Sequence, residues 1–237
     1  MVMAEYKDIY PNSPLVEVVF EIRFPGEPRV ECNRDLFYEK IRESFPKVLV
    51  PSIPAGGFPA LEPYRFESED QKSGMMVALN KFAYFARSYP GYAQFRNDAK
   101  KLVSEFVNAY RISKLIRTGL RYINIIPFSR ESGFIPVNRF LKIKLQLPEV
   151  FPDNFENLSF VFISKTPDGA ITTKIESIIT ADRSHEAILL DFDYSKEKEL
   201  AIDSIEQYLE ESHGHTKRIF EELITEEYRG YLKGDAV

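Results

Sequence analysis

The stretch Pro14-Leu-Val-Glu-Val-Val-Phe-Glu-Ile-Arg-Phe24 decides the fold of this chain. Its even-numbered residues Val16 to Phe24 are all apolar, whereas Glu17, Val19, Glu21 and Arg23 alternate with them. Side chains of a β-strand point to opposite faces in turn, so this pattern predicts a strand with one buried face and one mainly charged face.

The same pattern returns about 100 residues later, which is too long a period for a solenoid repeat and indicates two related half-folds. A strand that ends at Pro25 is echoed by one that ends at Pro127, and Phe82–Tyr89 is echoed by Ala187–Tyr194. The later strand of each copy leads into an amphipathic helix, for which Asp98 and Asp203 are the expected caps.

Working outward, the first half continues with a helix capped by Asn33 or Asp35 and ended by Pro46. The stretch from Val48 to Pro63 is rich in proline and glycine and predicts an irregular loop. After it we expect strands over Tyr64–Asp70, Met75–Asn80 and Phe82–Tyr89, with turns at Ser73-Gly74 and Asn80-Lys81, and a helix over Asp98–Ile112.

The second half repeats this order. It predicts a strand over Leu115–Phe128, a short helix at the start of Val137–Leu147, strands over Leu158–Lys165, Ile171–Thr180 and Ala187–Tyr194, and a long helix over Asp203–Leu232. Pro167-Asp168-Gly169 is a strong hairpin signal between two of these strands.

Each half therefore predicts strand, helix, three strands and helix, and the fold class is α+β. The expected division is 1–113 and 114–237, with both β-α-β-β-β-α halves forming one compact unit. Antiparallel sheets with long helices on one face resemble the helix-grip and TATA-binding-protein-like folds. That resemblance concerns the fold alone and implies nothing about binding to DNA.

The composition of the chain limits the classes of partner and the cellular location that we expect. The 237 residues carry a net charge of −5, which disfavours nucleic acid and acidic membranes as partners. The chain has no apolar run that approaches a membrane span and no signal-peptide pattern, so we expect a cytoplasmic protein. With Cys32 alone, no intramolecular disulfide can form.

Motifs for common chemistries are missing from the sequence. It contains neither a glycine-rich phosphate loop nor a nucleophile elbow. His213 and His215 lie two apart on a predicted helix, where they cannot bind one metal ion together. His213 continues the apolar stripe of Leu209 and is expected to be partly buried with a hydrogen-bond partner. We therefore predict no metal and no cofactor.

Charged residues on the predicted strands form the candidate site. Residues two apart on a strand share a face, so these side chains should gather on the face that the helices leave open. They could be a solvated face of complementary charges, a groove in which the arginines bind an anion, or acidic ligands for a divalent cation. The candidates are Glu17, Glu21, Arg23, Arg117, Arg121, Asp191 and Asp193, with Arg87 at a related place in the first half.

Several segments resemble a family of proteins. They are Pro14 to Phe24, Arg117-Thr-Gly-Leu-Arg-Tyr-Ile-Asn, Leu190-Asp-Phe-Asp and Phe220-Glu-Glu-Leu-Ile-Thr. The chain is similar, over nearly its whole length, to a sporadically distributed bacterial and archaeal family of uncharacterised proteins. The resemblance implies a prokaryotic cytoplasmic protein and carries over no activity and no catalytic residue.

The sequence as a whole favours a non-enzymatic binding module. Its charged sheet face or groove would receive a protein partner or a small anionic ligand, and a homodimer is compatible with the sequence. The alternative is a metal-assisted hydrolase acting on a phosphate ester or nucleotide through Asp191, Asp193, Glu17 and Glu21. An accessory role in a mobile element or in defence fits the distribution that the resemblance implies.

Overall fold

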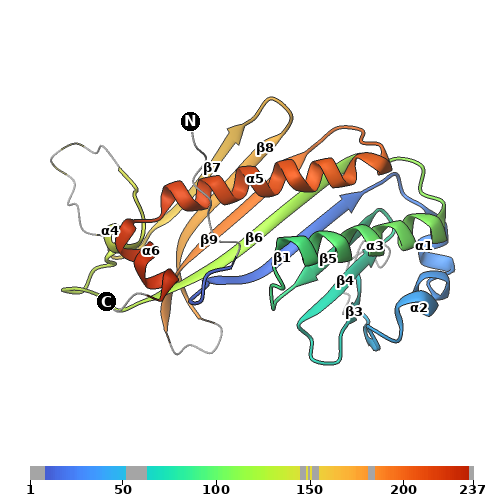
Figure 1. Ribbon diagram of the computed structural model, residues 1–237, viewed down its shortest axis with the longest axis horizontal. Coiled ribbons are helices and arrows are strands. Elements are labelled where there is room, and N and C mark those ends of the chain that lie inside the picture. The colour runs from blue at the N-terminus through green and yellow to red at the C-terminus, as the bar shows by residue number, and fades with distance from the viewer. Residues whose placement is uncertain are drawn as a thin grey trace.

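A single antiparallel sheet organises this α+β protein. The computed structural model describes residues 9–51, 63–144, 148, 150, 155–180 and 185–234. Nine strands form an open sheet in the order β2-β3-β4-β5-β1-β6-β9-β8-β7 (Figure 1). The strands are β1 (Leu15–Arg23), β2 (Lys47–Leu49), β3 (Tyr64–Glu67), β4 (Ser73–Ala78), β5 (Lys81–Ala86), β6 (Arg117–Phe128), β7 (Ser159–Lys165), β8 (Ala170–Ile179) and β9 (Glu186–Lys196).

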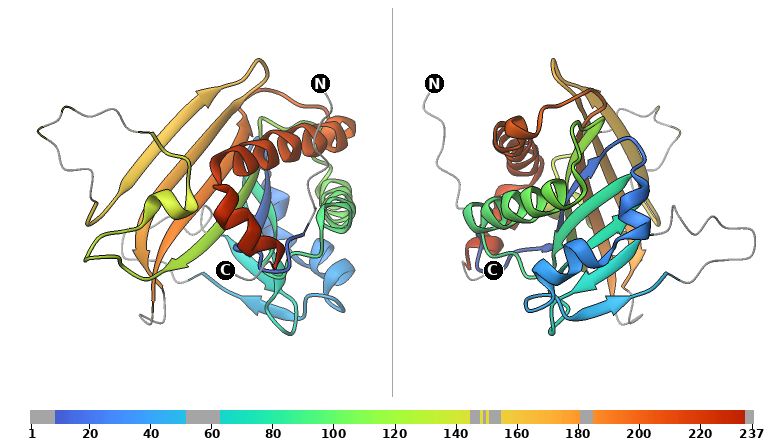
Figure 2. Two further views of the ribbon diagram at one scale, coloured as in Figure 1. Left: turned by 60° about the vertical axis from the view of Figure 1, so that its left-hand side comes forward. Right: turned by 90° about the vertical axis from the view of Figure 1, so that its right-hand side faces the viewer.

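Two long helices, α3 (Tyr92–Tyr110) and α5 (Ile205–Leu223), lie side by side across one face of this sheet (Figure 2). Phe106 of α3 packs on Phe24, the residue that follows β1, with ring centroids 5.5 Å apart. Tyr208 of α5 lies against Phe20 of β1 at 6.1 Å. Burial of aromatic side chains against the strands holds both helices in place. We call the opposite side, turned away from α3 and α5, the outer face.

The central strand confirms the prediction with one exception. Val18, Phe20, Ile22 and Phe24 are fully buried beneath the helices. Val16, expected on the same face, is exposed instead. The pairing register between β1 and β6 shifts between Leu15 and Glu17, and such a bulge interrupts the alternation of faces.

Two short helices stand where one was expected. Helix α1 (Pro28–Cys32) was not predicted; it starts with proline in its first turn, and the Glu27 carboxylate accepts a hydrogen bond from the Arg29 amide. Helix α2 (Asp35–Ile41) has Arg34 at its N-cap, so the expected caps Asn33 and Asp35 are wrong. Asn33 instead ends α1.

Strand limits in the first half also differ from the prediction. β2 occupies the start of the stretch predicted as a loop from Val48 to Pro63, and residues 52–62 of that stretch lie outside the described residues. Ser73-Gly74 is not a turn, because Ser73 already pairs in β4 and its amide and carbonyl both bond to Ser68. The next turn falls at Leu79-Asn80, one residue before the predicted position.

The predicted helix caps are wrong in both halves. α3 starts at Tyr92, six residues before Asp98, because the helix follows directly after Gly91, whose φ of 94° suits glycine. Asp98 lies inside the helix and accepts a hydrogen bond from Gln94. α5 starts after a short 3-10 helix, η2 (Ile202–Ser204), so its N-cap is Ser204 and not Asp203.

The long C-terminal helix predicted over Asp203–Leu232 is interrupted, and α6 (Glu226–Lys233) follows α5 as a separate helix. Ile224 is extended and forms an isolated bridge to Leu141, just beyond α4 (Val137–Phe140). The Thr225 hydroxyl then accepts a hydrogen bond from the Tyr228 amide and caps α6. The short helix expected at Val137 is confirmed, whereas Leu145 and Leu147 lie outside the described residues.

The β7–β8 hairpin at Pro167-Asp168-Gly169 is as predicted. Beneath the helices the core consists of two hydrophobic clusters, one centred on α3 and one on α6 and the end of α5, and Ile219 packs against both. In the described ranges, no helix is both long and apolar enough to cross a membrane.

Candidate functional site

A hollow on the outer face collects the charged residues that the sequence singled out. Its empty space, including the part open to solvent, is about 750 Å³. We call it the charged hollow, and it is lined by Glu17, Val19, Glu21, Arg23, Met76, Lys81, Arg117, Gly119, Arg121 and Asp193.

Strand register explains how these residues meet. Glu17, Val19, Glu21 and Arg23 are alternate residues of β1, so they share the outer face. Arg23 lies opposite Lys81 of β5 on one side and Arg117 of β6 on the other. Three basic residues thus stand in one row across three strands, an arrangement that repels unless carboxylates lie near it.

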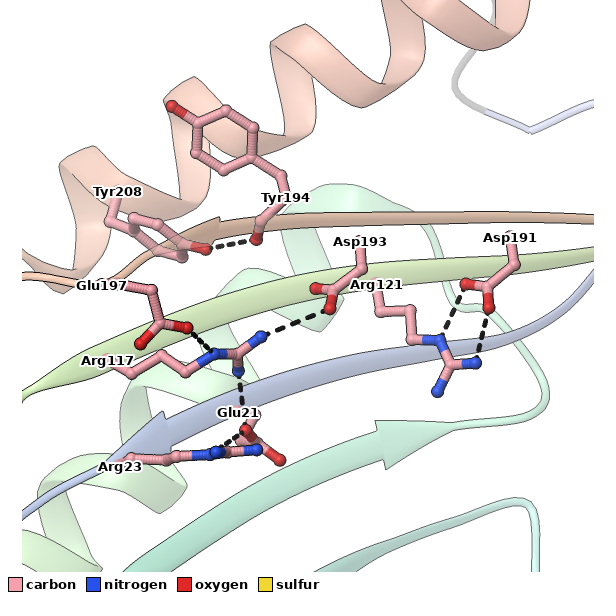
Figure 3. A network of polar contacts seen from close by, with 9 residues as sticks. All are labelled: Glu21, Arg23, Arg117, Arg121, Asp191, Asp193, Tyr194, Glu197 and Tyr208. Atoms are coloured by element: carbon pink, nitrogen blue, oxygen red, sulfur yellow. Dashed lines mark hydrogen bonds and ion pairs between the residues drawn. The ribbon is translucent and has the colours of Figure 1, made fainter. Parts of the chain in front are cut away.

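Arg117 is the centre of the network that supplies those carboxylates. Its Nη1 donates to Glu21 at 2.7 Å, its Nη2 to Asp193 at 3.3 Å and its Nε to Glu197 at 2.6 Å (Figure 3). Only 13% of the Arg117 side chain is exposed. Glu21 also accepts a hydrogen bond from Arg23 at 2.8 Å, so one carboxylate joins two of the three basic residues in the row.

A glycine makes this arrangement possible. A Cβ at Gly119 would lie 2.9 Å from Nη1 of Arg117. Any side chain at this position would therefore displace the guanidinium from the sheet surface. The local sequence Arg117-Thr-Gly-Leu-Arg121 thus lets one arginine lie flat against the strand, while the second stands free of it.

The second arginine makes a bidentate pair. Nε and Nη2 of Arg121 donate to the two oxygens of Asp191 at 2.7 and 2.6 Å (Figure 3). The residue directly opposite Arg121 in the register is Asp193, yet Arg121 bonds Asp191 on the diagonal, and Asp193 accepts from Arg117 instead. The Arg121 side chain is 47% exposed, in contrast to the covered Arg117.

Burial shifts the charge balance of the hollow. Removal from water raises the pKa of the Asp193 carboxyl, and the nearby Arg117 and Arg121 only partly offset this effect. Burial lowers the pKa of the Arg117 guanidinium, but the charges of Asp193 and Glu21 outweigh it, so the net shift is upward. A carboxyl with a raised pKa in a hollow is typical of functional sites and also of structural ion-pair networks.

The first half contributes a neighbouring cluster. Arg87 donates to Glu17 at 3.0 Å and lies 3.8 Å from the buried Glu67. Its guanidinium carbon stands 4.8 Å from the ring centroid of Phe85, and that of Arg65 stands 5.5 Å from the same centroid. Two arginines thus stack on one ring, with Glu67 between them.

The acidic candidates do not converge on one point. Asp191 is bound by Arg121, Asp193 and Glu21 by Arg117, and Glu17 by Arg87. Within the residues that the structure describes, no three His, Cys, Asp or Glu side chains are arranged to hold a metal ion.

Sequence reasoning placed the charged strands on one face but missed part of the hollow. Met76 and Lys81 come from β4 and β5, and neither carried a signal until the register between strands was known. Val19 is the one uncharged residue on the charged side of β1, and this interruption of the pattern was a usable signal. Glu197 lies just beyond β9 but continues the odd-numbered polar series of Asp191, Asp193 and Ser195, so its position was a usable signal.

A second hollow lies between the sheet and α5, with about 560 Å³ of empty space. His213 projects into it, half-buried as predicted. Its Nδ1 is 2.8 Å from the Tyr122 hydroxyl, and its ring stacks on Tyr92 with centroids 3.8 Å apart. The lining is mainly apolar, and several of its polar groups already have partners, since Tyr10 donates to Glu221 at 2.8 Å and Asn124 to the Leu190 carbonyl at 3.3 Å.

No protein-family model matches the chain, and no curated protein is significantly similar to it.

Proposed function

We propose that this protein is a non-enzymatic binding module that receives a partner protein on its outer face, at the charged hollow. Val19 and Met76 offer apolar surface inside a rim of charged side chains, four basic and three acidic. Protein interfaces commonly combine an apolar centre, a polar rim and an enrichment in arginine. This combination, on a face that α3 and α5 leave open, carries the proposal.

The hydrogen bonds favour a protein over a small anion. Every nitrogen of Arg117 that can donate already points at a carboxylate. Two of the three nitrogens of Arg121 do the same. A phosphate or carboxylate ligand would have to displace carboxylates of the protein from these arginines. The exchange of one anion for another would contribute little binding free energy. A partner with charges of both signs can instead add contacts around the rim.

The ion pairs also hold the rim in place before any partner arrives. When an interface orders a long side chain, the lost conformational entropy costs about 0.5–1.5 kcal/mol of binding free energy per side chain. Arg117 and Arg121 have lost much of that freedom already, because carboxylates fix them at two or more points. A rim organised in this way supports recognition with a smaller entropic cost.

Selection from a displayed library of random peptides, followed by measurement of binding to the full chain, tests the proposal. We expect selected peptides to bind the wild-type protein and to lose at least about tenfold in affinity with Arg121→Met or Val19→Asp. Arg42→Met is the matched control, because Arg42, the C-cap of α2, also makes two contacts to one carboxylate and is similarly exposed.

Two results would contradict the proposal. One is that selected peptides bind equally well to the Val19→Asp and Arg121→Met variants. The other is that calorimetry detects inorganic phosphate bound through Arg121 while no peptide competes with it, which would make the hollow an anion site. No observation in the described residues favours the alternative of a metal-assisted hydrolase.

We also propose that the two halves, 1–113 and 114–237, are related copies in a helix-grip or TATA-binding-protein-like arrangement. In support, β1 and β6 are adjacent at the centre of the sheet, β5 and β9 flank them, and β4 and β8 follow. Each half also lays one long helix, α3 or α5, on the same face. Kinship with the sporadically distributed prokaryotic family belongs to the same proposal and rests on the strand segments quoted above.

A further inference from the structure

Within the described residues, strand β7 is an unprotected edge of the sheet. It ends the strand order, and all of its seven residues except Phe160 are exposed. Three consecutive large apolar residues, Val161, Phe162 and Ile163, are 58%, 44% and 71% exposed. Charge is lacking until Lys165, and the strand contains no proline. Proteins usually protect such edges, because unpaired amides and carbonyls there bind other strands.

The opposite edge shows such protection within the same molecule. β2 has only three residues, it begins with Lys47, and prolines Pro46 and Pro51 stand close to its two ends. Short length, lysine and proline are the usual devices that prevent pairing at an edge. The contrast between the two edges indicates that β7 is kept open for a partner strand.

We propose that β7 pairs antiparallel with β7 of a second copy of this chain, so that two sheets join into one across a twofold axis at Phe162. The proposal is independent of the function assigned to the charged hollow, which spans β4, β5, β1, β6 and β9 and includes no residue of β7. Three features of β7 fit a second copy, and each follows from the register with β8.

The first feature is the direction of the free backbone groups. The Leu158 carbonyl accepts from Ser177, and the Thr166 amide donates to Gly169, so the even-numbered residues bond towards β8. In an antiparallel ladder the odd-numbered residues, Ser159 to Lys165, then turn their amides and carbonyls outward. A twofold axis at Phe162 pairs odd-numbered residues of the two copies with each other, Val161 with Ile163 and Ser159 with Lys165. Every outward amide or carbonyl of one β7 then faces an outward group of the other.

The second feature is the fit of the side chains. Val161 of one copy would lie beside Ile163 of the other on the outer face. The two Phe162 rings would meet at a non-hydrogen-bonded position on the opposite face, where cross-strand side chains approach most closely. Phe162 already stacks on Phe160 with centroids 6.1 Å apart, so four rings would form one cluster.

The third feature is charge complementarity at the ends. Lys165 of one copy would stand opposite Ser159 of the other, and Ser159 pairs with Glu176 of β8, whose carboxylate already pairs with Lys174 at 2.5 Å and would be shared between the two lysines. Neighbouring strands are about 4.8 Å apart, so two strand spacings separate the backbones of Lys165 and Glu176, a gap that both side chains together can span. The twofold axis makes this pair twice.

Sedimentation equilibrium of the full chain over a concentration series tests the proposal. We expect a reversible dimer for the wild-type protein, and at least about tenfold weaker dimers for Val161→Lys and Ile163→Glu, since each places a charge against an apolar partner twice. An equimolar mixture of the two variants should recover much of the loss, because the introduced lysine of one chain then faces the introduced glutamate of the other. Val48→Lys on β2 is the control and should dimerise like the wild type.

Three results would overturn the proposal: a wild-type chain that stays monomeric at the highest concentrations, a dimer that neither variant weakens, or a mixture no tighter than the separate variants. A mixture that gains nothing while both variants weaken the dimer would assign another register or another partner to β7. Circular dichroism establishes that each variant is folded, and the exposure of both positions makes folding of at least one the expected result.

Discussion

Replacement of Arg117 by methionine is the most direct test of the charged network. The substitution keeps most of the apolar stem and removes the guanidinium that bonds Glu21, Asp193 and Glu197. Removal of one partner from a buried ion pair costs about 3–5 kcal/mol. Glu197 is mostly exposed and Asp193 keeps some contact with water, so we expect a smaller loss in the free energy of unfolding, about 2–3 kcal/mol.

Arg121→Met provides the matched comparison on the same strand. Arg121 is 47% exposed, but its loss leaves Asp191, whose side chain is only 10% exposed, without its partner, so we expect a cost of about 1–2 kcal/mol. For a chain of this size 1 kcal/mol corresponds to a change of roughly 2–4 °C in Tm. Arg117→Met, which removes the partner of three carboxylates, should therefore lower Tm by roughly 5–10 °C and Arg121→Met by less.

The loss of unfolding free energy caused by Arg117→Met should also depend on pH. Burial raises the pKa of Asp193 in the folded state above its value in the unfolded chain, so the folded state binds more protons between these two values. The cost of burying this carboxylate is complete at neutral pH and falls as the pH drops through the folded pKa. Without Arg117 the pKa of Asp193 rises further, so the difference between variant and wild type should shrink at acidic pH.

Urea denaturation followed by circular dichroism, from pH 7 down through the acidic range in which the variants stay folded, measures both effects, since the chain has no tryptophan for fluorescence. The reasoning is refuted if Arg121→Met costs as much as Arg117→Met, or if the cost of Arg117→Met stays constant over that whole range.

Two further predictions concern the backbone around the site. Gly169→Ala should cost roughly 2–3 kcal/mol, because its Cβ would stand 2.4 Å from the Ser195 carbonyl, whereas Gly119→Ala needs only a side chain to move and should cost about 1 kcal/mol. Equal thermal shifts for the two variants would contradict this. Thr225→Ala should lower stability by about 1 kcal/mol through loss of the α6 cap, and an unchanged melting temperature would show that the cap contributes nothing.

Local alternation was enough to predict which charged residues share a face. The period of two in β1 and β6 survives folding because one face of each strand is buried beneath α3 and α5, and a slip of one residue would expose that whole face. The seven candidate residues therefore lie on one surface, as expected. What alternation could not predict was the partner of each residue: Arg121 bonds Asp191 and not the opposing Asp193, which depends on side-chain reach across the diagonal.

Helix ends were predicted poorly, because the deciding contacts are distant in sequence. The pattern of the C-terminal helix continues through Ile224, yet Ile224 bridges Leu141 and the Lys142 amide donates to the Leu223 carbonyl. Tertiary hydrogen bonds thus replace the helical ones at this point. At the start of α3, Asp98 is a good cap by residue type, but Gly91 allows the chain to enter the helix earlier.

The apparent repeat is visible in the order of the strands and helices, but the two halves are not separate folding units. The cluster centred on α3 also contains Leu120, Tyr194 and Tyr208 from the second half, and the other cluster takes Tyr10 from the first half, so both clusters cross the boundary between the halves. The charged hollow lies across the same boundary, where Glu21 of β1 accepts from Arg117 of β6. Two identical copies of the central strand would place like charges against each other there. Glu21 of β1 bonds both Arg117 of β6 and Arg23, the residue opposite Arg117, so the two central strands carry complementary charges only because their sequences differ at the charged hollow.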